Sequence, residues 1–271
     1  MSLKRCILFL LIVSCAVSSS AQKAGDLTQS RILILLDRSS SMIQPWANGK
    51  QKYKAADELI TALMDSMYAV NNQVEFGLRV FGHEHTVEEN NCQDTRNEVA
   101  FTRDNRAQMA LRLASISPLG VTAIAYSLKQ AANYDIVDIA HNAYSIILIT
   151  DGGESCGGDI CDVMRTLIDN KVYFKPYIIS LEDYPELKKT YDCMGNYLQV
   201  TKNGDIPIAV GAIVNAFRPV LKITNADYKQ LQSVAANTPK IMNINVPAIV
   251  VPADSIKAVS VKKPDTVIVP T

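Results

Sequence analysis

Short apolar runs alternate with amphipathic segments along most of this chain. Residues 31–36 (RILILL) and 144–150 (YSIILIT) are mainly apolar runs that end in polar loops. This pattern is typical of strands that are buried on both faces of a sheet. Residues 49–70, by contrast, carry apolar side chains at steps of three and four, which predicts an amphipathic helix.

The same alternation extends to about residue 217. We expect further strands at 74–81, 98–101, 172–181 and 197–201, and further helices at 104–114, 122–134, 159–170, 185–194 and 206–217. Asp104 and Asp159 are expected to cap the helices that they begin. Strands that alternate with helices predict a doubly wound α/β fold: a mainly parallel sheet, helices on both faces and one short antiparallel edge strand at 98–101.

The two ends of the chain do not share this alternation. Residues 1–21 combine a basic start, an apolar run and small residues, as a secretory signal peptide does. The apolar run is about half of the ~20 residues that cross a bilayer, so we expect no transmembrane span after cleavage. A lipobox-like stretch leaves a lipid anchor at Cys15 open as an alternative. Residues 22–217 form the predicted domain, and residues 218–271 form a proline-punctuated extension without a core of its own.

The charge balance argues against two classes of partner. The chain has 27 basic and 27 acidic residues, and removing Lys4 and Arg5 with the signal peptide leaves 25 against 27. A nearly neutral protein has no general electrostatic attraction for nucleic acid or for an anionic membrane surface. We therefore expect no binding to nucleic acid or to an anionic membrane surface. The signal peptide predicts an exported protein of the periplasm, cell envelope or extracellular space.

Four cysteines lie outside the predicted signal peptide: Cys92, Cys156, Cys161 and Cys193. An exported protein meets oxidising conditions, so this even number indicates up to two disulfides, for which three pairings exist. We expect a local Cys156–Cys161 bridge, because the intervening residues include two glycines that let the chain turn back.

The clearest chemical signal is a polar loop directly after the run at 31–36. Asp37, Ser39 and Ser41 follow one another at two-residue steps, so an extended turn can direct all three toward one point. Their oxygen atoms are hard donors that suit Mg²⁺, Ca²⁺ or Mn²⁺ rather than zinc or copper. Taken alone, the pattern is equally compatible with a helix cap or a turn.

Two other junctions add oxygen donors to this loop. Asp151 follows the predicted strand at 144–150, and Thr122 lies where a loop enters a predicted helix. Because parallel strands place their carboxyl ends at one edge of the sheet, we expect both residues to lie near Asp37. The predicted metal ligands are therefore Asp37, Ser39, Ser41, Thr122 and Asp151.

These motifs resemble the von Willebrand factor type A domain over about residues 30–217. Residues 37–42 (DRSSSM) and 147–152 (ILITDG) fit the family closely, and all five ligand positions of its metal-ion-dependent adhesion site are filled. Residues 118–125 (PLGVTAIA) look like the bacterial threonine loop, with Ala123 where proline is usual. Further stretches look like an exported bacterial subgroup of the family: Phe81-Gly82-His83, Cys92, 154–161 and Cys193.

The resemblance also implies how such a site works. Three neutral hydroxyls contact the ion, while Asp37 and Asp151 act largely through bound water, so the metal keeps one position open. A carboxylate of a protein partner can fill that position. The resemblance thus implies a Mg²⁺-dependent protein-binding or adhesion module rather than an enzyme, with Ca²⁺ or Mn²⁺ as alternative ions.

Two other functions stay open at this stage. A strand-end aspartate with Mg²⁺ also occurs in haloacid-type phosphatases, but these need a second acid two residues later, where this chain has Ser39. The other alternative is a structural envelope protein whose metal only stabilises the fold. The sequence contains neither the Gly-x-Ser-x-Gly elbow of serine hydrolases nor a phosphate-binding loop that ends in Gly-Lys.

Other residues near the predicted site have simpler interpretations. His83 and His85 could face one metal ion together, but no third ligand is evident beside them. We therefore expect residues 83–85 to form an exposed loop. Met42 and Trp46 lie beside the metal loop, where they either contact a partner or pack against the first helix.

Overall fold

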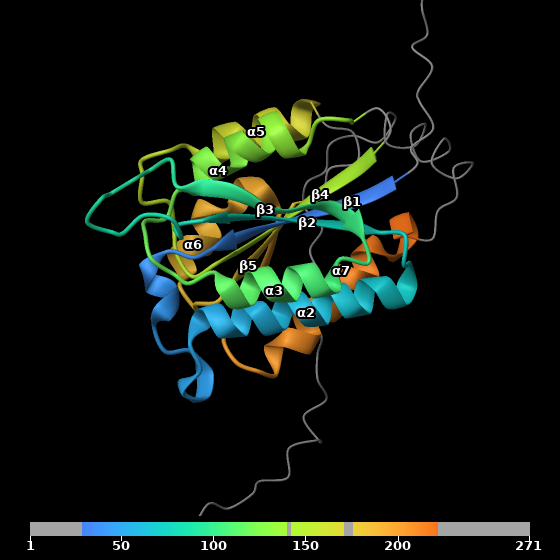
Figure 1. Cartoon of the computed structure of the whole chain (residues 1–271), viewed down its shortest axis with the longest axis horizontal. Coiled ribbons are helices and arrows are strands. Elements are labelled where there is room, and N and C mark those ends of the chain that lie inside the picture. The colour runs from blue at the N-terminus through green and yellow to red at the C-terminus, as the bar shows by residue number, and fades with distance from the viewer. Residues whose placement is uncertain (1–28, 140–141, 171–175, 222–271) are drawn as a thin grey trace, which may run out of the picture. The chain divides into compact units, whose positions relative to one another are not determined.

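A computed structural model of the chain describes residues 29–139, 142–170 and 176–221. It contains a six-stranded sheet in the order β3-β2-β1-β4-β5-β6 (Figure 1). The strands are β1 (Gln29–Asp37), β2 (Glu75–Phe81), β3 (Thr95–Arg103), β4 (Asn142–Thr150), β5 (Tyr177–Ser180) and β6 (Asn196–Gln199). Within this sheet β3 is antiparallel to β2, and every other neighbouring pair is parallel. The α/β fold predicted from the sequence is confirmed.

Helices cover both faces of the sheet. The α-helices are α2 (Lys52–Val70), α3 (Arg106–Ser115), α4 (Ile124–Gln130), α5 (Ile160–Asn170), α6 (Pro185–Thr190) and α7 (Asp205–Leu221). Short helical turns are η1 (Ser40–Ile43), η2 (Ala47–Gly49), η3 (Ala131–Asp135) and η4 (Asp192–Met194). Figure 1 shows α2, α3 and α7 on one side of the sheet and α4 and α5 on the other. None of the described helices is long and apolar enough to cross a membrane.

The apolar run of β1 contributes to both cores. Its alternate residues Ile32, Ile34 and Leu36 belong to the core beneath α2, α3 and α7. Leu33 and Leu35 belong to the core beneath α4 and α5. All five are at most 1% exposed. Because neighbouring side chains of a strand point to opposite faces, only a continuous apolar run can supply both layers.

Some predicted boundaries differ from the structure. The edge strand is nine residues long, Thr95–Arg103, because its backbone pairs with β2 well beyond the predicted stretch at 98–101. Its outer positions carry polar side chains, which removes the apolar pattern on which the shorter prediction depended. β5 begins only at Tyr177, and residues 171–175 lie outside the described part of the chain.

The two predicted helix caps have different outcomes. Asp159 accepts a hydrogen bond from the N–H of Asp162 at 2.9 Å and so caps α5, as predicted. The cap predicted at Asp104 is wrong, because Asn105 occupies the N-cap position of α3. Asp104 lies just before it with a positive φ of 47°, in the turn that connects β3 to α3. The Asn105 side chain donates to the carbonyl oxygen of Phe76 instead of capping α3.

The two ends of the chain fall mostly outside this description. The predicted signal peptide at 1–21, with Cys15, lies outside the described residues. Of the predicted extension at 218–271, residues 218–221 complete α7, and the rest lies outside the described residues.

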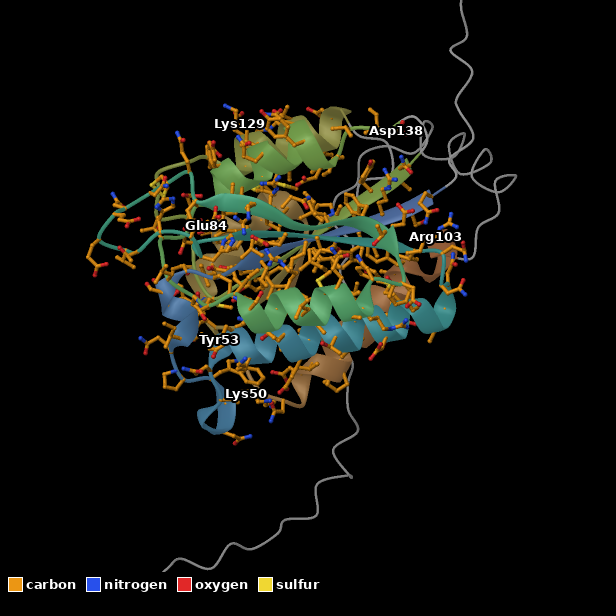
Figure 2. The ribbon with its side chains drawn as sticks, viewed as in Figure 1. Lys50, Tyr53, Glu84, Arg103, Lys129 and Asp138 are labelled. Carbon is orange, nitrogen blue, oxygen red and sulfur yellow. A yellow bond between two sulfur atoms is a disulfide. The ribbon has the colours of Figure 1, made fainter. Side chains whose placement is uncertain are left out.

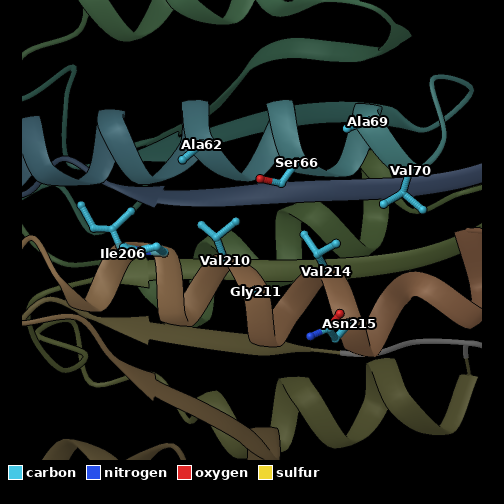
Figure 3. A pocket seen from close by; sticks show the side chains of 10 residues that line it. Ala62, Ser66, Ala69, Val70, Ile206, Val210, Gly211, Val214 and Asn215 are labelled. Atoms are coloured by element: carbon cyan, nitrogen blue, oxygen red, sulfur yellow. The ribbon is translucent and has the colours of Figure 1, made fainter. Parts of the chain in front are cut away.

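A groove of about 710 Å³ runs between α2 and α7 (Figure 3). Its lining consists mainly of small and aliphatic residues, among them Ala62, Ala69, Val70, Val210, Gly211 and Val214. None of the predicted metal ligands belongs to this lining, so the groove is separate from the predicted site.

Candidate metal centre

β1 and β4 are neighbours at the point where the order of the sheet reverses. From β1 the chain moves outward to β2 and β3 and then returns to β4 on the other side of β1. In such sheets the loops after the two central strands diverge and leave a crevice at the strand ends. Asp37 ends β1 and Asp151 directly follows β4, so both carboxylates lie at this edge. In Figure 2, Tyr53 and Glu84 lie toward this edge, and Arg103 and Asp138 lie toward the opposite one.

Asp37 is held by hydrogen bonds from the loop after β1 and from the last residue of β4. Its Oδ1 accepts from the backbone N–H of Ser39 at 2.7 Å, and its Oδ2 accepts from the hydroxyl of Thr150 at 2.6 Å. Burial, followed by the nearby charge of Asp151, raises the pKa of Asp37 to about 7. A carboxylate in this position is electrostatically unfavourable, and a bound cation would relieve it.

Ser39 and Ser41 connect the first carboxylate to the second. Their Oγ atoms are 3.1 Å apart, and the hydroxyl of Ser41 donates to Oδ1 of Asp151 at 2.8 Å. In an octahedral Mg²⁺ site with metal–oxygen distances of 2.0–2.1 Å, adjacent oxygens lie about 2.8–3.0 Å apart. The spacing and the hard-oxygen chemistry of these residues therefore fit a Mg²⁺ ion.

The loop of Thr122 is attached to the Ser39 loop through the backbone. The N–H of Ser40 donates to the carbonyl oxygen of Gly120 at 2.9 Å, and Ser39 and Gly120 form a parallel bridge. Thr122 lies two residues after Gly120 and is 9% exposed. The structure thus places four of the predicted ligands in one chain of contacts and brings the loop of the fifth alongside.

Gly82 makes this close approach of loops feasible. Its φ is 70°, and a Cβ atom there would lie 2.8 Å from the carbonyl oxygen of Val121 and 2.9 Å from the backbone of Ser39. A side chain would meet both loops at once, and the backbone conformation itself favours glycine. Gly82 is therefore a structural requirement of the site rather than a ligand.

Lys52, the first residue of α2, contacts the predicted ligand Asp151, a role that was not predicted from the sequence. Its ammonium donates to Oδ2 of Asp151 at 2.9 Å and also pairs with Glu182, which follows β5 closely. Burial alone would lower the pKa of Lys52, but the hydrogen bonds to Glu182 and Asp151 outweigh it and raise the pKa. Lysine is rarely buried unless it is paired, so its residue type offered no signal for this position.

Arg38 anchors the loop that contains Asp37, Ser39 and Ser41 to α2. Its side chain is fully buried, its guanidinium pairs with Asp57 of α2, and it lies 5.5 Å from the centre of the Tyr53 ring. An arginine in a polar loop is normally exposed, so the sequence did not reveal this role. Because Arg38 lies between Asp37 and Ser39, its anchor restrains both residues.

The predicted Cys156–Cys161 bridge is wrong. The structure joins Cys92 to Cys156 and Cys161 to Cys193. Cys161 lies in the first turn of α5, and the cap at Asp159 starts this helix before Cys161. The rigid helical turn holds Cys161 next to η4, whereas Cys156 stays in the loop after β4. The two glycines between Cys156 and Cys161 therefore do not determine which cysteines pair.

The Cys92–Cys156 bridge joins the loops after β2 and β4 beside the predicted site. Next to it, the N–H of Ser155 donates to the carbonyl oxygen of Thr122 at 3.0 Å, and the Ser155 hydroxyl accepts from the N–H of Thr122 at 2.9 Å. Glu154 accepts from the N–H of Ala125 at 2.7 Å. The loops of Cys92, Thr122 and Asp151 therefore form one connected unit.

The exposed position predicted for His83 is wrong, whereas the side chain of His85 is 44% exposed. The His83 side chain is only 4% exposed, and its Nε2 lies 2.9 Å from a carboxylate oxygen of Glu98. Burial lowers the pKa of His83. Glu98 also pairs with Arg96 and Arg112, and the cluster borders a pocket of about 400 Å³. These contacts join β2 to β3 and α3, a structural role that explains the burial.

Met42 and Trp46 pack inside the domain. Met42 is fully buried, and Trp46 is 8% exposed. The indole N–H of Trp46 donates to the carbonyl oxygen of Val200 at 3.1 Å. Of the two roles considered for these residues, the structure therefore favours packing.

The predicted site contains only two acidic residues, so it differs from metal sites built from several His, Cys, Asp or Glu side chains. In that part of the chain, no group of three or more His, Cys, Asp or Glu side chains is arranged to hold a metal. The predicted site relies on hydroxyls for three of its five ligands, and hydroxyls bind hard ions such as Mg²⁺.

Comparison with known proteins agrees with this architecture. The von Willebrand factor type A domain matches residues 32–249. This chain belongs to the von Willebrand factor type A domain family. The uncharacterized protein YwmC of Bacillus subtilis (strain 168) is 31% identical over 135 residues, which is 48% of this chain and 57% of YwmC. The chain thus matches little more than half the length of this curated relative.

Solved structures show the same fold. The conserved hypothetical protein BatB from Bacteroides thetaiotaomicron aligns with a TM-score of 0.55 and 20% identity, over 72% of this chain and all of BatB. Proximal thread matrix protein 1 from the mussel byssus, with a zinc-occupied MIDAS motif, aligns with a TM-score of 0.53 and 14% identity. That match covers 72% of this chain and 47% of the mussel protein. At these identities the likeness concerns the fold of this domain.

Proposed function

We propose that this protein is an exported binding module that holds Mg²⁺ at Asp37, Ser39, Ser41, Thr122 and Asp151. The ion would connect the module to an acidic group of a protein partner. The observation that carries the proposal is the chain of oxygens at 2.8–3.1 Å between Ser39, Ser41 and Asp151, at the carboxyl ends of β1 and β4. Domains of this family act as protein-interaction modules, and the mussel relative holds zinc at its MIDAS motif.

The residues of the site suit an acidic partner. When bound, Mg²⁺ supplies an electron-poor centre that accepts a further oxygen ligand. Ser39, Ser41 and Thr122 offer neutral hydroxyls, so only Asp37 and Asp151 bring negative charge. Both acids are expected to act largely through bound water, so few negative charges touch the ion directly. The positive charge of the ion is therefore incompletely neutralised within the protein, which favours an anionic ligand.

Exposed apolar side chains on the same loops support a protein as the partner. Ile43, two residues after Ser41, is 45% exposed, and Leu119, three residues before Thr122, is 39% exposed. Apolar surface next to a polar anchor is typical of protein interfaces, where it is buried on binding. A partner segment with an acidic residue flanked by apolar ones would fit this surface.

Export belongs to the same proposal. The two disulfides fit an oxidising compartment, where such bonds persist. The basic and apolar start of the chain is the sequence feature that would direct the protein there.

Partner capture from a cell-envelope extract tests the proposed function. Immobilised protein is expected to retain a partner with Mg²⁺, release it into EDTA and retain it again after Mg²⁺ is restored. Ser41→Ala should lose this retention because it removes a ligand. Ser66→Ala, in the distant groove between α2 and α7, makes the same chemical change and should behave as the wild type. Retention that survives both EDTA and Ser41→Ala would contradict metal-bridged binding.

A hydrolase is the less supported candidate. A second acid two residues after Asp37 would be needed as a proton donor, and Ser39 occupies that position. No contact among the described residues gives Ser39 or Ser41 a histidine base that would activate the hydroxyl.

A further inference from the structure

Lys52 occupies a position that a divalent cation would contest. Its Nζ lies 2.9 Å from Oδ2 of Asp151, and the two side chains are only 7% and 2% exposed. The other oxygen of Asp151 accepts from the Ser41 hydroxyl at 2.8 Å. Both oxygens of a predicted metal ligand are thus engaged from within the protein, one of them by a positive charge.

Glu182 offers Lys52 a second acidic partner. It follows β5, which lies next to β4 in the sheet, and its carboxylate pairs with the same ammonium. Its side chain is 45% exposed, and it is not one of the predicted ligands. A lysine side chain is long and flexible, so its ammonium can move between two carboxylates while its aliphatic stem stays packed.

We infer that Lys52 is a built-in counter-cation of the metal site, which neutralises Asp151 in the metal-free protein and shifts toward Glu182 when a divalent cation binds. The inference rests on the proposed function, because it concerns the same ion. Without Lys52, Asp37 and Asp151 would be two buried carboxylates without a compensating charge. With Lys52 in place, the incoming ion is repelled by the ammonium until the ammonium moves away.

Two consequences follow for metal binding. Lys52 stabilises the metal-free protein, and it lowers the affinity for the ion. A variant that lacks the charge of Lys52 should therefore be less stable in the absence of metal, and it should bind metal more tightly. Glu182 has the opposite influence, because it offers the ammonium an alternative to Asp151.

Calorimetric titration with MgCl₂ tests this inference on four proteins. Lys52→Met is expected to bind Mg²⁺ about tenfold more tightly than the wild type, because one positive charge near the ion has been removed. Glu182→Gln should bind more weakly, because Lys52 then keeps Asp151 as its acidic partner. Lys129→Met is the matched control: Lys129 is exposed in the last turn of α4, so the affinity of this variant should match the wild type.

The outcomes separate this inference from the proposed function. If the wild type binds Mg²⁺ and Lys52→Met binds equally or more weakly, the counter-cation role is wrong while the metal site stands. Tighter binding by Glu182→Gln would also overturn it, and this variant decides the matter if Lys52→Met does not fold. If none of the four proteins binds Mg²⁺, the proposed function fails and the inference fails with it.

Discussion

At the scale of single residues, Asp37 is the most constrained group of the site. It is fully buried, accepts from Ser39 and Thr150, and lies close to the charge of Asp151. Its carboxylate therefore destabilises the fold in the absence of a cation and would favour the binding of one. This residue links the stability of the metal-free domain to pH.

Asp37→Asn is expected to stabilise the metal-free protein above pH 7. The pKa of Asp37 is about 7 in the folded protein, against about 3.9 in an unfolded chain. The folded state thus binds more protons between these values, so the contribution of this residue to stability falls as pH rises through that window. Urea unfolding in EDTA should show a gain for the variant on the order of 1–2 kcal/mol at pH 8 and little gain near pH 4. A difference between the two proteins that is independent of pH would contradict this.

At the scale of elements, the predicted site depends on close contacts between the loops after β1 and β2 and the loop between α3 and α4 that holds Thr122. Gly82 follows β2 and lies against Ser39 and Val121 of the other two loops, with a positive φ and no room for a Cβ atom. Arg38 attaches the first loop to α2 through Asp57. These contacts between loops and helix do not use the side chains of the predicted ligands.

Gly82→Ala should therefore disturb both the fold and the site. Its added methyl group meets the backbones of Val121 and Ser39, and its φ of 70° is strained for alanine. We expect the free energy of unfolding to fall by about 1–3 kcal/mol and Mg²⁺ affinity to fall with it. Gly211→Ala is the control, since nothing lies within 4 Å of its Cβ position in α7. Thermal unfolding should show equal or greater stability for that variant, and similar losses for both would contradict this role of Gly82.

Much at this scale could be predicted from residue patterns. β1 and β4 follow from continuous apolar runs, and the approach of Asp37 to Asp151 follows from the common edge of parallel strands. The contacts that link Asp37, Ser39, Ser41 and Asp151 agree with the residue pattern of these loops, while metal binding by them stays a prediction. The role of Lys52 could not be predicted, since its partners Asp151 and Glu182 are distant in the chain and lysine is usually exposed.

At the scale of the whole molecule, two disulfides tie distant segments of the chain together. Their pairing depends on how α5 and the loop after β4 are oriented, which no spacing of cysteines reveals. Cys92–Cys156 spans 64 residues and joins the loop after β2 to the loop after β4, which carries Asp151. Cys161–Cys193 spans 32 residues and joins α5 to η4, outside the loops that carry the predicted ligands.

The two bridges are expected to differ in their effect on metal binding. Replacing Cys92 and Cys156 by serine should lower the free energy of unfolding by about 2–4 kcal/mol. It should also weaken Mg²⁺ binding, because the loop after β4, which carries Asp151 and contacts Thr122 through Ser155, loses a restraint. The matched pair, Cys161→Ser with Cys193→Ser, should lower stability somewhat less and weaken Mg²⁺ binding less, because neither cysteine lies in a loop that carries a predicted ligand. Chemical unfolding and calorimetry on both double variants check this. Equal losses of affinity would show that the first bridge has no special relation to the site.

Calorimetric titration of the protein with Mg²⁺ most directly tests the central claim, that Asp37 and Asp151 belong to one metal site. The wild type should bind one ion per chain. Asp37→Ala and Asp151→Ala should each lose the heat of binding, whereas Asp65→Ala, at a 59% exposed position on α2, should bind as the wild type does. Equal affinity in all four proteins, or no binding by the wild type, would contradict the account.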